Sequence, residues 1–108
     1  MKKISNFFEI KNKLSVITGA SGNLGSVICE TLAELGSDII LIDNTSTKKN
    51  LKKISNKLKK NFTDQKFYYF NCNFENRKQK LILFKKLNKS KKIDILINNA
   101  GYNGPKNG

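Results

Sequence analysis

The chain has 108 residues, which is enough for one small domain. Its formal net charge is +13, from 21 Lys and Arg residues against 8 Asp and Glu residues. Arg77 is the single arginine, so the cations are almost all lysines. Because proteins that read nucleic acid usually contact it through arginine and aromatic side chains, we interpret the charge as a basic, solvated surface and expect no specific nucleic-acid partner.

Metal sites and membrane segments have no support in the composition. The chain has no His, and its two cysteines, Cys29 and Cys72, lack the spacing of metal ligands. We therefore expect no metal and two buried, reduced thiols. The first ten residues, MKKISNFFEI, contain no apolar run of signal-peptide length, and no stretch has the length of a membrane span. These features predict a cytoplasmic protein with no membrane partner.

The first predicted strand is the short apolar run Leu14–Thr18, which leads into a glycine-rich turn. A helix is expected over residues 23–35, and Gly36 stands where a C-cap glycine belongs. Six residues at helical spacing predict the buried face of this helix: Leu24, Val27, Ile28, Thr31, Leu32 and Leu35.

The second predicted strand, Asp38–Ile42, is nearly all apolar and ends at Asp43, as is typical of a parallel strand covered on both faces. Ser46 or Thr47 can cap a second helix that runs to about residue 60. The apolar positions of this helix are Leu51, Ile54 and Leu58, and its other faces carry seven lysines, which we interpret as solvated.

The third predicted strand is the aromatic run Lys66–Phe70. A third helix is expected over residues 75–88, with Leu81, Phe84 and Leu87 facing inward. The fourth strand, Ile93–Ile97, runs into a second polar turn, residues 98–101.

This alternation of strands and helices predicts a parallel α/β sheet with right-handed crossovers. The expected strand order is 3-2-1-4 with flanking helices, which is the N-terminal half of a doubly wound Rossmann fold. We expect residues 1–101 to form this half-domain, and residues 102–108, which include Gly104 and Pro105, to form a loose tail.

The glycine-rich turn, residues 18–25, is the first candidate binding site. Gly19 permits a tight turn, Gly22 allows the backbone to approach a pyrophosphate, and Gly25 lets the helix pack on the sheet. The helix N-terminus presents free N–H groups to the phosphates. Asp43, at the end of the second strand, can accept both hydroxyls of the adenosine ribose and would repel a 2′-phosphate. The pattern predicts NAD as the cofactor, in preference to NADP.

Four features in order resemble the short-chain dehydrogenases/reductases. They are the Thr-Gly-x-x-x-x-x-Gly turn at Thr18–Gly25, the acid Asp43, the pair Asn73-Phe74, and Asn98-Asn99-Ala100-Gly101. The resemblance covers almost the whole chain. It implies that a set of residues from all four features binds the cofactor: Gly19, Ser21, Gly22, Asn23, Leu24 and Gly25 at the pyrophosphate, Asp43 at the ribose, Asn73 and Phe74 at the adenine, and Asn99, Ala100 and Gly101 along the cofactor.

Two positions depart from the family pattern. The middle glycine of the family falls where Asn23 stands, and the spacing of Gly22 is similar to that of the extended branch, which modifies sugar nucleotides. The Asn-Asn-Ala-Gly stretch favours the short, single-domain branch instead. The second departure is Asn73, where the family often has Asp; an amide keeps the acceptor oxygen.

The resemblance also implies what this stretch of sequence lacks. The family uses a Tyr, a Lys four residues later on a helix, and an upstream Ser. Tyr102 and Lys106 have that spacing, but Gly104 and Pro105 between them prevent a shared helical face. We therefore assign no catalytic residue and expect an N-terminal part of an NAD-dependent oxidoreductase that is inactive alone.

Three other functions stay open from the sequence. They are a non-enzymatic dinucleotide-binding or redox-sensing module, a part of an extended-branch epimerase or dehydratase, and a basic protein that binds nucleic acid. Besides the dinucleotide, the fourth strand is a candidate site of self-association, because it would leave an unpaired sheet edge.

Overall fold

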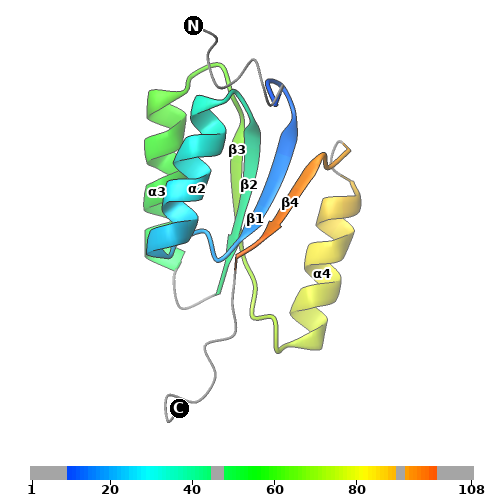
Figure 1. Cartoon of the computed structure of the whole chain (residues 1–108). Helices are drawn as coiled ribbons and strands as arrows, with labels where there is room; N and C mark the ends of the chain where they lie inside the picture. The colour runs from blue at the N-terminus through cyan, green and yellow to red at the C-terminus, as the bar shows by residue number, and fades with distance from the viewer. Residues whose placement is uncertain (1–9, 45–47, 90–91, 100–108) are drawn as a thin grey trace, which may run out of the picture.

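Four strands form one sheet in the computed structural model, which describes residues 10–44, 48–89 and 92–99. They are β1 (Leu14–Thr18), β2 (Asp38–Asp43), β3 (Phe67–Asn71) and β4 (Ile95–Asn98). All neighbouring strands are parallel, and their order is β3-β2-β1-β4. The structure confirms the predicted α/β fold with strand order 3-2-1-4 (Figure 1).

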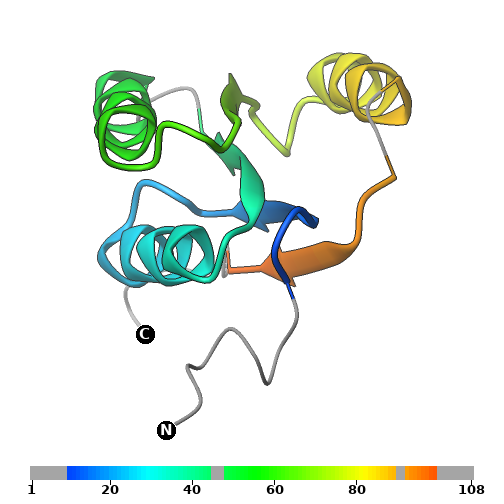
Figure 2. The same ribbon diagram turned by 90° about the horizontal axis from the view of Figure 1, so that it is seen from above.

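Three helices connect the strands: α2 (Asn23–Glu34), α3 (Lys48–Asn61) and α4 (Arg77–Asn88). Helices α2 and α3 cover one face of the sheet, and α4 lies on the other side (Figure 2). Each helix was predicted, with ends that differ from the structure by at most two residues. The predicted caps Ser46 and Thr47 lie outside the described residues.

Alternate residues of the strands supply two separate apolar layers. Ile17, Ile39 and Leu41 belong to the layer under α2 and α3. Val16 and Ile40, their neighbours along the same strands, belong to the layer on the α4 side. This two-sided burial explains why the first two strands are continuous apolar runs rather than alternating ones.

The buried face of α2 differs in part from the prediction. Ile28, Leu32 and Leu35 do pack on the core, but Leu24 is 64% exposed and Val27 is 59% exposed. The most deeply buried positions are the small residues of the helix: Gly25, Cys29 and Ala33, which recur every fourth residue. Small residues let the helix axis approach the sheet closely, so they, and not the larger apolar residues, select the inward face.

The buried face of α4 was predicted wrongly at two of its three positions, Leu81 and Phe84. Leu81 is 53% exposed and Phe84 is 61% exposed, whereas Leu83 is buried and Leu87 packs partly beside it. Residues 81–84 are four consecutive apolar residues that point to every side of the helix. Helical periodicity therefore could not select the face that contacts the sheet.

The predictions for Gly36 and for the two cysteines are confirmed. Gly36 has φ +95°, the left-handed conformation of a residue that ends a helix. Cys29 and Cys72 are free and buried. Burial raises the pKa of Cys29 to about 12, and it raises the pKa of Cys72 against the opposing effect of Lys80. Both thiols are therefore neutral at pH 7.

Candidate functional site

The glycine-rich turn joins β1 to α2 at the carboxyl edge of the sheet. Gly19 has φ +68°, and its carbonyl oxygen accepts a hydrogen bond from Gly22 N at 3.3 Å. Ala20 N donates to Ile42 O at 3.2 Å, which ties the turn to the neighbouring strand. A Cβ atom on Gly25 would lie 2.0 Å from Gly19 O, so the turn and the first helical turn touch backbone to backbone. The predicted reasons for glycine at 19 and at 25 are both met.

Gly22, unlike Gly19 and Gly25, could be replaced by a larger residue without a clash or backbone strain. A Cβ atom there would meet only Gly19 O, at 3.6 Å, which is an ordinary contact. The backbone of Gly22 is extended, with φ −74° and ψ 170°, and other residues can adopt this conformation. The protein itself therefore does not require glycine at this position, and a ligand that approaches the backbone remains the predicted reason for it.

The N-terminus of α2 carries unpaired backbone donors. Gly22 is the N-cap residue and supplies no side-chain cap, and the first intrahelical bond runs from Ser26 N to Gly22 O at 2.9 Å. Within residues 10–44, 48–89 and 92–99, no hydrogen-bond acceptor is found for the N–H groups of Asn23, Leu24 and Gly25. The first turn of α2 also has no acidic residue. This end of the helix can bind an anion through these donors and the helix dipole.

Asp43 and Ser21 form one hydrogen-bonded unit between β2 and the turn. The Asp43 carboxylate accepts from Ser21 N at 2.8 Å and also from the Ser21 hydroxyl. Its other oxygen accepts from Asn44 N at 2.7 Å. The sequence assigned Ser21 to the pyrophosphate and Asp43 to the ribose; the structure places both at one point, with Ser21 orienting the carboxylate.

Replacement of Ser21 by Ala is expected to lower stability through Asp43. Hydrogen bonds to charged groups contribute about 1.5–3 kcal/mol, and the backbone donor of Ser21 would remain, so we expect a loss of about 1–2 kcal/mol in the free energy of unfolding. Denaturant titration of Ser21→Ala, Asp43→Ala and the double variant measures the coupling between the two side chains.

Ser26→Ala is the matched control for Ser21→Ala. The Ser26 hydroxyl donates only to the nearby, exposed Asn23 O at 3.0 Å, so its loss is expected to cost less than about 0.5 kcal/mol. A coupling energy near zero between Ser21 and Asp43 would contradict the positioning role of Ser21.

Asn73 and Phe74 follow β3 at the same edge of the sheet. Cys72 N donates to Asp43 O at 2.8 Å, which places Asn73 one residue beyond the candidate ribose site. Asn73 Oδ1 accepts from Glu75 N at 3.0 Å, and Asn73 N donates to Gln79 Oε1 at 2.8 Å. Phe74 is 39% exposed, so its ring is accessible to a ligand. The sequence analysis did not single out Gln79, which fixes this turn by accepting from Asn73 N. Its role depends on how the chain enters α4.

Asn99 connects the turn after β4 to the glycine-rich turn. Its backbone N donates to Thr18 Oγ1 at 3.0 Å, and its side-chain amide donates to Gly19 O at 3.3 Å. The Thr18 hydroxyl donates in turn to Asn98 Oδ1 at 2.9 Å. The sequence did not single out Thr18 for this relay. Ala100 and Gly101, the last two predicted site residues, lie outside the described residues.

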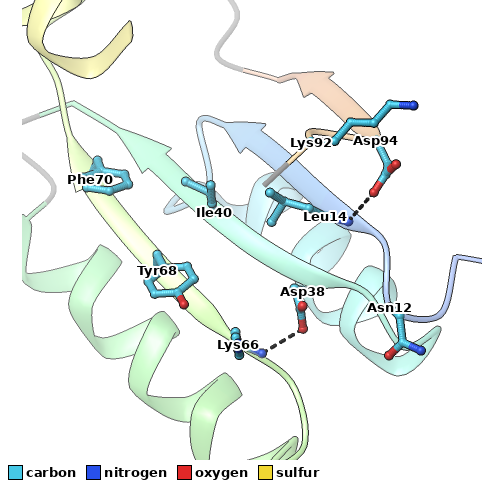
Figure 3. A pocket seen from close by; sticks show the side chains of 9 residues that line it. All are labelled: Asn12, Leu14, Asp38, Ile40, Lys66, Tyr68, Phe70, Lys92 and Asp94. Atoms are coloured by element: carbon cyan, nitrogen blue, oxygen red, sulfur yellow. Dashed lines mark hydrogen bonds between the residues drawn. The ribbon is translucent and has the colours of Figure 1, made fainter. Parts of the chain in front are cut away.

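A separate cavity lies over the face of the sheet on the α4 side. Its volume is about 480 Å³, and Figure 3 shows Leu14, Ile40, Tyr68 and Phe70 as the apolar part of its lining. None of the candidate site residues that the structure describes lines it. We therefore place the candidate site at the glycine-rich turn, on the basis of its geometry, and not in this cavity.

Two other kinds of site, a metal centre and a membrane span, have no support in the described part of the chain. No three His, Cys, Asp or Glu residues there are grouped as metal ligands would be. No helix among those residues has both the length and the apolar character needed to cross a membrane.

Comparison with known proteins gives one consistent result. The family model for short chain dehydrogenase matches residues 13–107. A 3-oxoacyl-(acyl-carrier-protein) reductase, FabG of Rickettsia felis, is 38% identical over 93 residues, which are 86% of this chain and 34% of that protein. A 15-hydroxyprostaglandin dehydrogenase (NAD⁺) of Rattus norvegicus is 32% identical over 101 residues, 92% of this chain and 37% of that protein. The chain thus spans about a third of the length of these relatives.

Solved structures agree with the sequence relatives. NAD⁺-bound xylitol dehydrogenase matches with a TM-score of 0.76 and 28% identity, over 89% of this chain and 36% of the other. L-sorbose reductase from Gluconobacter frateurii, complexed with NADPH and L-sorbose, matches with a TM-score of 0.72 and 26% identity, over 86% and 35%. These matches favour neither a sugar-nucleotide epimerase nor a nucleic-acid-binding protein.

Proposed function

Because the chain belongs to the short-chain dehydrogenase family, we propose that it binds NAD at the carboxyl edge of its sheet and forms the dinucleotide-binding part of an oxidoreductase. The observation that carries this proposal is the junction of Asp43 with Ser21, beside a helix N-terminus with free donors. An anion and a ribose diol are the two groups that such a junction is suited to bind.

The residues present fit a dinucleotide. In our proposal the N–H groups at the start of α2 bind the pyrophosphate, with Gly19, Gly22, Asn23, Leu24 and Gly25 forming its cradle. Ser21 and Asp43 hold the ribose hydroxyls, and Asn73 and Phe74 flank the adenine. Asn99, Ala100 and Gly101 line the cofactor beyond β4. When bound, NAD would supply the hydride acceptor, and the residues of this chain bind and orient it.

The choice of NAD over NADP depends on charge at Asp43. A carboxylate that accepts from the ribose hydroxyls repels the 2′-phosphate of NADP. The turn Thr18–Gly25 contains no Lys or Arg that could neutralise that phosphate. The first cations after β2, Lys48 and Lys49, begin α3 instead and are exposed. The solved relatives bind NAD⁺ in one case and NADPH in the other, so the preference has to come from these local residues.

Asp43→Ala is expected to weaken NAD binding at least about tenfold and to narrow the preference over NADP, since a charge-assisted hydrogen bond contributes about 1.5–3 kcal/mol. Calorimetric titration of the parent chain and of the variant with both cofactors measures this. Equal or tighter binding of NADP by the parent chain would rule out the proposed role of Asp43.

Asp38→Ala provides the matched control for Asp43→Ala. Asp38 is the first residue of the same strand, so it lies at the opposite end of β2 from Asp43. Its carboxylate accepts a hydrogen bond from Lys66 N at 2.8 Å. Its removal takes away the same charge without touching the glycine-rich turn. We expect the affinity for NAD to stay within about twofold of the parent value. A loss as large as that of Asp43→Ala would mean that general charge, and not local contact, controls binding.

A further inference from the structure

The turn between β3 and α4 binds its own hydrogen-bond acceptors. Asn73 Oδ1 accepts from Glu75 N at 3.0 Å, and Asn73 O accepts from Asn76 N at 2.9 Å. Gln79 Oε1 accepts from Asn73 N at 2.8 Å, and Asn76 Oδ1 accepts from Gln79 N at 3.0 Å. The acceptor oxygen that an amide keeps at position 73 is thus used within the turn, by a backbone N–H group.

These bonds fix the orientation of the three side-chain amides. A backbone N–H group can only donate, so the amide atom that faces it must be the oxygen. The NH₂ group of each amide then lies on the other side of the carbon atom that carries both. Within residues 10–44, 48–89 and 92–99, no acceptor is found for the NH₂ groups of Asn73, Asn76 and Gln79. The side-chain amides of this turn therefore offer a ligand donors.

The backbone at the end of β2 is occupied in a similar way. Asp43 O accepts from Cys72 N at 2.8 Å, and Asn44 O accepts from Asn71 Nδ2 at 3.0 Å. The carboxylate of Asp43 is assigned to the ribose in the proposed site. Among the described residues, Glu75 is the other acid that follows a strand at this edge of the sheet, and its side chain is exposed. A base that lies at Asn73 therefore meets the amide NH₂ group before any unoccupied acceptor of these strand ends.

Purine bases differ at their 6-position in the partner that they need. Adenine carries an amino group there, which donates, whereas hypoxanthine and guanine carry a keto oxygen, which accepts. A protein acceptor that faces this position binds adenine and repels a 6-oxopurine. A protein donor can bind the keto oxygen, and it can also bind a ring nitrogen of adenine. Phe74, whose ring is 39% exposed, adds no discrimination, because every base has a face that stacks on an aromatic ring.

We propose that Asn73 makes the base subsite tolerant of 6-oxopurines, so that the chain binds nicotinamide hypoxanthine dinucleotide about as tightly as NAD. This inference rests on the proposed function, because it takes the base to lie at Asn73 and Phe74. Asn73 Nδ2 donates to the keto oxygen of hypoxanthine or to a ring nitrogen of adenine. Because neither base faces an acceptor at its 6-position, neither is rejected.

Calorimetric titration of the parent chain with the two dinucleotides tests this tolerance. The ligands share the pyrophosphate, both riboses and the nicotinamide, so a difference between their dissociation constants reports on the base subsite alone. We expect the two dissociation constants to agree within about threefold.

Asn73→Asp is expected to create a preference for adenine. One carboxylate oxygen keeps the bond to Glu75 N, and the other replaces the NH₂ group by an acceptor. That oxygen accepts from the amino group of adenine and repels the keto oxygen of hypoxanthine. We expect NAD to bind the variant at least as tightly as the parent chain, and the hypoxanthine dinucleotide to bind it at least about tenfold more weakly than NAD.

Asn76→Asp is the matched control, because it makes the same change of amide to carboxylate three residues later. Asn76 is the N-cap of α4, and Asp is as good an N-cap as Asn, so the helix start is preserved. We expect this variant to bind the two dinucleotides with dissociation constants within about threefold of each other. Glu75→Gln removes the exposed acid of the turn, and we expect it to behave in the same way.

Three results would overturn the proposed tolerance and leave the proposed function intact. The first is a parent chain that binds NAD at least about tenfold more tightly than the hypoxanthine dinucleotide. The second is a preference for NAD that Glu75→Gln abolishes, which would make Glu75 the group that reads the base. The third is equal discrimination by Asn73→Asp and Asn76→Asp, which would indicate a general effect of charge. A parent chain that binds neither dinucleotide would refute the proposed function itself, and this inference with it.

Discussion

Gly25→Ala is expected to destabilise the chain more than any other single methyl group added in the turn. The new Cβ atom would lie 2.0 Å from Gly19 O and 2.9 Å from Gly19 C, and both atoms belong to backbone that cannot rotate away. Overpacking of this kind costs about 3 kcal/mol, which corresponds to a decrease of roughly 12–24 °C in the melting temperature of a domain this small. Thermal unfolding followed by circular dichroism measures the decrease.

Gly22→Ala is the control, because it adds the same methyl group three residues earlier. Its Cβ atom would meet only Gly19 O, at 3.6 Å, so we expect the stability to change by less than about 1 kcal/mol. If the backbone of Gly22 does approach a pyrophosphate, this variant should keep its fold and bind NAD more weakly. Equal melting temperatures for the two variants would contradict the close contact between Gly25 and the turn.

The strands and their order were predictable because they depend on local pattern and on chain connectivity. The apolar runs of β1 and β2 are long, are bounded by polar or glycine residues, and are covered on both faces. Parallel crossovers of one hand then leave few arrangements for four strands. The turn glycines were predictable for a related reason, since a left-handed φ at Gly19 and a backbone contact at Gly25 each exclude other residues.

The inward face of α3 was predicted correctly, since Leu51, Ile54 and Leu58 do pack on the core. The inward faces of α2 and α4 could not be predicted as well, because they depend on how closely each helix approaches the sheet. The short distance between Gly25 and Gly19 rotates α2 so that Cys29 and Ala33 point inward and Leu24 outward. No such contact holds α4, and its four consecutive apolar residues gave no preferred face. The prediction from hydrophobic period alone failed where small residues, or a lack of polar residues, determine the packing.

The candidate site, like the fold, could be predicted from the sequence only in part. The sequence predicted Asp43 from its place at the end of β2, and the structure puts it there. The hydrogen bond to Ser21 depends on two segments 22 residues apart, and the sequence assigned Ser21 to a different part of the cofactor. Thr18 was missed because its contact with Asn98 arises from tertiary arrangement and leaves no spacing pattern. Gln79 was missed because its contact with Asn73 N, six residues away, depends on how the chain enters α4.

The other large effect expected is an absence of catalysis by the 108-residue chain. Hydride transfer between NAD and an alcohol or carbonyl also moves a proton at the substrate oxygen, so a positioned acid or base is needed. The chain has no His. Tyr68 and Tyr69 lie in β3, and within the described residues neither has a Lys one helical turn away on the same helix, which is how the family places this pair.

We therefore expect no dehydrogenase or reductase turnover by this polypeptide, with any alcohol or ketone, even at saturating cofactor. Nicotinamide absorbance across a broad substrate panel measures this directly. Tyr102→Phe is the informative variant, because Tyr102 and Lys106 have the family spacing while Gly104 and Pro105 between them oppose a shared helix. Turnover that disappears in Tyr102→Phe would show that this tyrosine acts as the acid or base after all. Turnover that persists in the variant would require another proton donor, and it would refute the view that this chain contributes cofactor binding and no proton transfer.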